Sequence, residues 1–194
     1  MKEELEICVK VLVPFKEIIS DMLEKGFHVQ EEFQLNDIYM VQKDKEISLK
    51  EADRLLSNYV LVRETVGKRI LLTLKNKEIN SKGEIVKQSS VKCPICSVED
   101  GYKFMKELGY KKLLEIRDHN ILLSNGKNEI YVQDVEGLGT YIEMEQKNLL
   151  LDNNNGNNIE DMINTLNSYN LEIDKSNYFA KKSYDMLKKV IENK

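Results

Sequence analysis

The chain has 194 residues, and its 29 lysines and arginines against 33 aspartates and glutamates give a formal net charge of −4 at pH 7. This acidic balance gives no general attraction to nucleic acid, and no apolar run is long enough to span a bilayer. Three cysteines do not suggest a disulfide framework, and the start of the chain lacks the apolar segment of a signal peptide. We therefore expect a cytoplasmic protein that binds neither nucleic acid nor membrane.

Residues 3–11 predict a β-strand with two unlike faces, because successive side chains of a strand point to opposite sides. The apolar face consists of Leu5, Ile7, Val9 and Val11. The polar face consists of Glu4, Glu6, Cys8 and Lys10. Two carboxylates on one face can share a hard divalent cation through oxygen ligands. For an isolated strand, a solvated polar face is the simpler interpretation.

A helix and a series of strands are expected next. Pro14 and Gly26 bracket a segment with helical apolar spacing. The strands expected after it cover residues 27–43, 59–63, 68–75, 84–92, 111–123, 128–135 and 140–149. Turn signals at 66–67 and 124–126 predict two hairpins, and the polar residues 44–58 predict an excursion or a short helix.

Three more helices follow from local signals. Ser97 with Asp100 resembles a capping box before a helix at about 98–108, which Gly109 ends. Two amphipathic helices are expected after the Asn-rich loop at 152–158.

The count of roughly eight mostly antiparallel strands predicts an α+β fold. Polar strand faces of mixed sign favour an eight-stranded antiparallel closed β-barrel, with flanking helices over its apolar outside and charges inside. We expect residues 1–149 to form the barrel and residues 150–194 to form C-terminal helices packed on it in the same domain. The alternative is an ordinary sheet with an apolar core and its charges in solvent.

Five pieces of the sequence occur in an order that resembles a known family. They are Glu4-x-Glu6, Asp37-x-Tyr39, Leu61-Val62-Arg63, Leu72-Thr73-Leu74-Lys75, and residues 134–145, in which Gly137-Leu138-Gly139 precedes Glu143-x-Glu145. The chain resembles the CYTH family, the triphosphate tunnel metalloenzymes, which include class IV adenylate cyclases, thiamine triphosphatases and inorganic triphosphatases. The resemblance implies an eight-stranded tunnel that holds Mg²⁺ or Mn²⁺ on its acidic side and a triphosphate on its basic side.

The resemblance also implies roles for single residues. The implied metal ligands are Glu4, Glu6, Glu143 and Glu145. The implied phosphate ligands are Arg63 and Lys75, with Arg69 and Arg117 as further candidates. Lys10 would act with Glu4 and Glu6 in catalysis. The implied ligand is ATP, thiamine triphosphate or tripolyphosphate. A cyclase would use the ribose 3′-hydroxyl to attack the α-phosphorus and release pyrophosphate, whereas a hydrolase would direct water at the γ-phosphorus. The sequence does not choose between them.

Several positions depart from the family pattern. Cys8 stands where the family has a lysine, although Lys10 lies on the same face about 7 Å further along. Leu61 and Gln133 replace an expected arginine and aspartate, and expected charged residues are absent near Ser89, Val91, Asp118 and Asn120. Because phosphoryl transfer depends on positioning and electrostatic stabilisation, each loss weakens the site. Enzymatic activity therefore stays open.

The main alternative is a catalytically degenerate nucleotide- or polyphosphate-binding module. A third interpretation is an unrelated antiparallel α+β protein. A homodimer is also left open, because tunnels of this kind often pair but no stretch here specifies an interface. Cys93-Pro94-Ile95-Cys96 has zinc or redox spacing, but no second such pair accompanies it. His119 could touch phosphate beside Arg117, although a surface histidine is the simpler interpretation.

Overall fold

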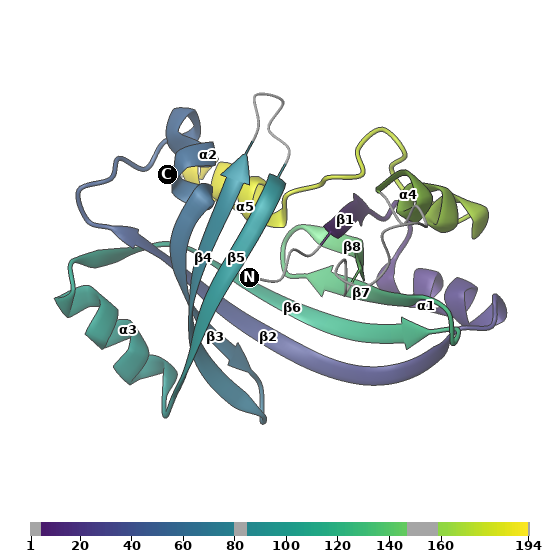
Figure 1. The fold of residues 1–194 in the computed structure, drawn as a ribbon, viewed down its shortest axis with the longest axis horizontal. Helices are drawn as coiled ribbons and strands as arrows, with labels where there is room; N and C mark the ends of the chain where they lie inside the picture. The colour runs from purple at the N-terminus through teal and green to yellow at the C-terminus, as the bar shows by residue number, and fades with distance from the viewer. Residues whose placement is uncertain (1–4, 80–84, 147–158, 194) are drawn as a thin grey trace, which may run out of the picture. The chain divides into compact units, whose positions relative to one another are not determined.

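This computed structural model describes residues 5–79, 85–146 and 159–193. The strands are β1 (Leu5–Lys10), β2 (His28–Gln42), β3 (Asn58–Thr65), β4 (Arg69–Ile79), β5 (Ile85–Ile95), β6 (Tyr110–Ser124), β7 (Glu129–Val135) and β8 (Gly139–Gln146). The helices are α1 (Phe15–Glu24), η1 (Leu49–Glu51), α2 (Ala52–Ser57), α3 (Val98–Glu107), α4 (Ile159–Ser168) and α5 (Lys182–Glu192). These bounds confirm the strands and helices expected from the sequence within the described residues (Figure 1). The end of the last expected strand, residues 147–149, and the Asn-rich loop at 152–158 lie outside them.

The strands form one antiparallel sheet in the order β1-β8-β7-β6-β2-β3-β4-β5. The prediction of a closed β-barrel is wrong, and with it the prediction of a tunnel, because this order begins at β1 and ends at β5. The α+β class and the antiparallel pairing are confirmed.

The outer edge of β1 is occupied by another segment of the chain, residues 172–180, which is called the edge strap below. The backbone N–H of Cys8 donates to the carbonyl of Tyr178 at 3.0 Å, and the carbonyl of Cys8 accepts from the N–H of Ala180 at 2.8 Å. The carbonyl of Lys10 accepts from the N–H of Asp174 at 2.8 Å. Since these groups are the ones that a further strand would use, the edge strap ends the sheet at β1.

The chain forms two compact units, which are described separately. Unit 1 comprises residues 34–117 and 182–194, and unit 2 comprises residues 2–33 and 118–181. The expected division at residue 149 stays a prediction, because residues 147–158 lie outside the described parts of the chain.

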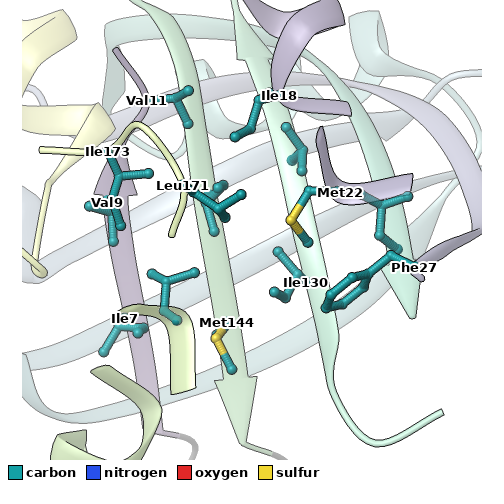
Figure 2. Close-up of a cluster of buried hydrophobic side chains, with 14 of the residues drawn as sticks. Ile7, Val9, Val11, Ile18, Met22, Phe27, Ile130, Met144, Leu171 and Ile173 are labelled. Atoms are coloured by element: carbon teal, nitrogen blue, oxygen red, sulfur yellow. The ribbon is translucent and has the colours of Figure 1, made fainter. Parts of the chain in front are cut away.

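The core of unit 2 lies between its strands and helices α1 and α4. Ile7 and Val9 of β1 are completely buried, as are Ile18 and Met22 of α1. Figure 2 shows these side chains pointing toward one another, together with Leu171 and other apolar residues. The predicted apolar face of the first strand is therefore confirmed, and its alternate residues are left for the opposite, polar face.

The core of unit 1 lies beneath helix α3. Val60 and Val62 of β3 pack with Met40 of β2 and with Met105 of α3. Helix α3 begins at its predicted cap, because the backbone N–H of Asp100 donates to the Ser97 hydroxyl oxygen at 3.0 Å. In the same unit, α2 packs against β3, β4 and α5 (Figure 1). No helix in the described parts of the chain is long and apolar enough to cross a membrane.

Candidate functional site

Unit 1 carries a polar sheet face on the side opposite its α3 core. Residues directly opposite in an antiparallel ladder share a face, so the strand register gives rows of neighbouring side chains. The central row is Tyr39, Leu61, Thr73 and Lys92. The adjacent rows are Asp37, Arg63, Leu71 and Pro94 on one side, and Tyr59, Lys75 and Ser90 on the other.

Thr73 stands in the middle of this face and is 1% exposed. Its hydroxyl oxygen is buried and has no hydrogen-bond partner among the described residues. Lys92 is directly opposite on β5, with the two Cβ atoms about 5 Å apart. Lys75 lies two residues along β4, about 7 Å away, and Arg63 is the diagonal neighbour on β3 at about 7 Å. The register therefore sets three cationic residues from three strands at positions next to one buried hydroxyl. We call this arrangement the Thr73 cluster.

The guanidinium of Arg63 is held by Asp37 of β2. Arg63 Nε donates to Asp37 Oδ1 at 2.7 Å, and Arg63 Nη2 donates to Oδ2 at 2.5 Å. The Asp37 side chain is 5% exposed, whereas that of Arg63 is 31% exposed. A bidentate pair of this kind fixes the plane of the guanidinium and restricts the freedom of the Arg63 side chain.

Aromatic side chains line the β2 and β3 side of this face. The rings of Tyr39 and Tyr59 stack with centroids 5.0 Å apart, and Lys77 Nζ lies 5.8 Å from the centre of the Tyr59 ring. Arg69, which the sequence also suggests as a phosphate ligand, shares the face but lies at the start of β4. It is about 13 Å from Thr73 along the strand, so the structure does not bring it to the Thr73 cluster.

Unit 2 carries a second polar face, which contains the carboxylates suggested as metal ligands. Glu6 is directly opposite Glu145, and Cys8 is directly opposite Glu143. Glu4, the remaining suggested ligand, lies outside the described residues. Like charges that face each other across a ladder repel each other. Glu145 also lines a pocket of about 380 Å³ beside α4.

The magnesium site expected from the sequence stays a prediction. No group of three or more Asp, Glu, His or Cys side chains gathers closely enough to hold a metal in the parts of the chain that are described. Mg²⁺, however, is commonly bound by one or two carboxylates, with water and substrate phosphates as its other ligands. Glu6 and Glu145 meet that lower requirement because both offer hard oxygen donors from adjacent strands.

Lys10, the suggested catalytic lysine, is exposed and lies on the same face of unit 2. Its Nζ is 5.7 Å from the centre of the Tyr141 ring, which is completely buried. It also lies near Asp174 of the edge strap. The side-chain and backbone hydrogen bonds from Ser176 lower the pKa of Asp174, and the positive charge of Lys10 lowers it further. These contacts give Lys10 a local structural role beside the suggested catalytic one.

Arg117 belongs to a small ion-pair group on β6. Its Nη2 donates to Glu115 Oε1 at 2.7 Å, and Lys112 Nζ donates to Glu115 Oε2 at 2.5 Å. The hydrogen bond from Lys112 is the main reason that the pKa of Glu115 lies below its usual value, and Arg117 adds to the effect. His119 contacts Glu32 at 2.7 Å and the ring of Phe15. These contacts give His119 local partners within unit 2.

The three cysteines are free thiols, with Cys8 buried and Cys93 and Cys96 exposed. Because β5 is extended through Ile95, the Cα atoms of Cys93 and Cys96 are about 10 Å apart. A disulfide requires a separation below about 7 Å. The extended backbone also keeps the two thiols from converging on one zinc ion, so the structure disfavours both alternatives for this pair.

Two features of these faces were missed in the sequence. The local sequence did not single out Lys92, because the strand around it is weakly patterned, whereas pairing with β4 places Lys92 opposite Thr73. Asn120 of β6 is completely buried, and its Oδ1 has no hydrogen-bond partner among the described residues. No local pattern identifies either feature, since both depend on neighbouring strands.

The chain was also compared with known proteins. No family model matches it. It is 28% identical over 185 residues to a Methanocaldococcus jannaschii protein named "putative adenylate cyclase", and the match covers 93% of this chain and 96% of that protein. Its fold is similar to that of a conserved hypothetical protein from Pyrococcus furiosus, with a TM-score of 0.68 and 15% identity over 94% of this chain and 99% of the other. A "putative adenylate cyclase" structure from Vibrio parahaemolyticus gives a TM-score of 0.65 and 12% identity over 96% and 98%. The two structural likenesses show a shared fold.

Proposed function

We propose that this protein binds the phosphate chain of a small-molecule triphosphate and acts on it with a divalent cation, as an adenylate cyclase does. The observation that carries the proposal is the Thr73 cluster, in which Arg63, Lys75 and Lys92 occupy positions next to a buried hydroxyl that has no partner among the described residues. The name of the Methanocaldococcus jannaschii relative supports the cyclase reaction over hydrolysis.

The chemistry of the Thr73 cluster suits phosphate oxygens. Arginine and lysine form charge-assisted hydrogen bonds with phosphate, and a threonine hydroxyl can donate one more. Asp37 orients Arg63 so that less freedom is lost when the guanidinium meets an anion. Such pre-positioned donors stabilise the charge that develops during phosphoryl transfer.

The carboxylates of unit 2 are the proposed cation ligands. Glu6 and Glu145 would hold Mg²⁺ or Mn²⁺, with Glu143 one position along the same face. When bound, the cation would supply a Lewis acid at this face of unit 2. Glu4 stays a prediction as a further ligand. In the proposed reaction the ribose 3′-hydroxyl of ATP gives its proton to water, and its oxygen bonds to the α-phosphorus. The bond between the α-phosphorus and the oxygen that bridges to the β-phosphorus breaks, and cyclic AMP and pyrophosphate form.

A second candidate is a nucleotide- or polyphosphate-binding module without turnover. The observation that favours it is the environment of Lys10, which contacts Tyr141 and lies near Asp174, while the buried Cys8 occupies the expected lysine position. A protein of this kind would bind triphosphates through the Thr73 cluster and release no product.

The experiment that tests the proposal is an assay for pyrophosphate, orthophosphate and cyclic AMP with Mg²⁺ and then Mn²⁺. The substrates are ATP, GTP, thiamine triphosphate and tripolyphosphate. We expect cyclic AMP and pyrophosphate from ATP, and loss of both in the double variant Glu6→Gln/Glu145→Gln. Release of orthophosphate without cyclic AMP would show that the protein hydrolyses triphosphates and is not a cyclase.

Binding is measured in parallel to separate the two candidates. Tripolyphosphate affinity should fall about tenfold in Lys92→Ala and in Lys75→Ala, since each loses a charge-assisted contact. Lys103→Ala is the matched control, because Lys103 is an exposed lysine on α3 that pairs with Glu99. Tripolyphosphate binding without turnover on any substrate would favour the binding module. Equal affinities in all three variants would overturn the assignment of the Thr73 cluster.

A further inference from the structure

The polar face of unit 2 contains a row of side chains that the proposed function does not use. Across four adjacent strands, the register sets Lys10 opposite Tyr141, Tyr141 opposite Gln133, and Gln133 opposite Asn120. Tyr141 and Asn120 are completely buried, and Gln133 is 5% exposed. Polar groups at this depth normally have hydrogen-bond partners, so each one requires an account.

Gln133 and Asn120 differ in this respect. Gln133 Nε2 donates to Glu143 Oε2 at 3.0 Å. Asn120 Nδ2 donates to Asp118 Oδ1 at 2.6 Å, whereas Asn120 Oδ1 is buried without a partner among the described residues. The amide cannot simply be reversed, because Oδ1 would then face the Asp118 carboxylate and two acceptors would repel. The carboxylate therefore fixes Asn120 Oδ1 as an acceptor that lacks a donor.

Aromatic surface lies beside this acceptor. Tyr131 is opposite Leu122 and is thus the diagonal neighbour of Asn120, at about 7 Å between Cβ atoms. Its ring meets that of Phe33 edge to face, with centroids 6.5 Å apart and an interplanar angle of 82°. Both side chains are half-buried. An amide acceptor next to a partly exposed aromatic ring is a combination that proteins use to hold nucleobases, which stack on the ring and donate from an amino group.

We propose that Asn120 and Tyr131 form a subsite in unit 2 for the nucleoside part of a ligand. Asn120 Oδ1 accepts a hydrogen bond from an N–H or O–H group of that nucleoside, and Tyr131 stacks on its base. The subsite requires no phosphate, so this inference does not depend on the Thr73 cluster of unit 1. Because Asn120 Oδ1 is sealed from solvent, the flexible side chains of the row, above all Gln133 and Lys10, must rotate to admit the ligand.

Adenosine tests the inference directly, because it lacks phosphate. Its binding to the full chain is measured by calorimetry, and the result expected for the wild type is saturable binding. Asn120→Leu should weaken it about tenfold, since one hydrogen bond to a buried acceptor is lost. The matched control is Asn128→Leu, because Asn128 Nδ2 donates to the Tyr169 hydroxyl at 2.8 Å, outside the row. Thermal unfolding confirms that each variant is folded.

Two further arms identify the donor and guard against a misfolded variant. Purine riboside lacks the amino group of adenosine, and 2′- and 3′-deoxyadenosine each lack one hydroxyl. The group that donates to Asn120 is the one whose removal weakens binding, relative to adenosine, in the wild type but not in Asn120→Leu. Tyr131→Leu leaves Asn120 in place and should weaken adenosine and purine riboside equally. The subsite would be overturned if the wild type did not bind adenosine, or if Asn120→Leu and the wild type bound it with equal affinity. Failure of the proposed function would instead appear as no product from any triphosphate, or as wild-type protein that does not bind tripolyphosphate.

Discussion

Replacement of the buried threonine in unit 1 gives a prediction in which stability and binding change in opposite directions. Thr73→Val keeps the shape of the side chain and exchanges the hydroxyl for a methyl group. The hydroxyl oxygen is buried without a partner among the described residues, and the residue is 1% exposed. The variant therefore removes a buried polar group that is not hydrogen-bonded and adds apolar contact in its place.

The magnitude follows from the cost of burying an unpaired polar group, which is about 1–3 kcal/mol. We expect Thr73→Val to raise the free energy of unfolding by about 1–2 kcal/mol. For a chain of this size, each kcal/mol corresponds to a rise of about 2–4 °C in the midpoint of thermal unfolding. Tripolyphosphate affinity should fall about fivefold to tenfold in the same variant, because a donor to phosphate is lost.

The assay is urea unfolding followed by circular dichroism, with calorimetric titration of tripolyphosphate on the same samples. The matched control is Thr65→Val. Thr65 is also a buried threonine on the sheet of unit 1, but its hydroxyl is not one of the fully buried atoms that lack a hydrogen-bond partner. Thr65→Val should change stability less. Equal stabilisation of the two variants, or a clear loss of stability in Thr73→Val, would refute the reasoning. Stabilisation with unchanged affinity would show that the hydroxyl does not contact phosphate.

Three further predictions follow from single contacts. Arg63→Met should destabilise unit 1 by about 1–2 kcal/mol more than Asp37→Asn in urea unfolding. The reason is that Arg63→Met leaves the buried Asp37 carboxylate without its arginine partner. Equal loss of stability in the two variants would contradict this prediction. Ser97→Ala should cost about 1 kcal/mol through loss of the α3 cap, whereas Ser176→Ala, outside the helices, should not reduce the helical circular dichroism signal. The hydrogen bond from Lys112 lowers the pKa of Glu115 in the folded protein below its ordinary value of 4.5. The contribution of Glu115 to stability is therefore present above pH 4.5 and is lost as the pH falls through the pKa of the folded state. Lys112→Met should reduce that acid dependence in unfolding experiments between pH 2 and 6, and an unchanged profile would disprove the assignment.

Helices and strands could be predicted because their signals are local. Alternation of apolar and polar residues in β1, the turn at Gly67, and the Ser97 cap each act over a few neighbouring residues. Gly67 adopts a φ of +71°, which favours glycine over residues with a Cβ atom. Local sequence therefore determined where these elements begin and end.

The candidate site was predictable in part. Alternation correctly placed Glu6, Cys8 and Lys10 on one face of β1, and the register now pairs the first two with Glu145 and Glu143. The phosphate-binding and metal-binding roles stay predictions. Lys92 and the neighbours of Asn120 could not be found from the sequence, because a side chain on one strand gains its cross-strand neighbours only through register.

The sequence by itself determined the positions of the elements and which residues of a strand share a face, since both follow from the 2.0 and 3.6 residue periods of strands and helices. The tertiary structure decided whether the sheet closes. Closure depends on which segment satisfies the outer backbone groups of β1, and the edge strap, more than 160 residues later in the chain, supplies those hydrogen bonds. It also decided that Thr73 Oγ1 and Asn120 Oδ1 are buried without hydrogen-bond partners among the described residues, because desolvation results from the packing of several distant segments.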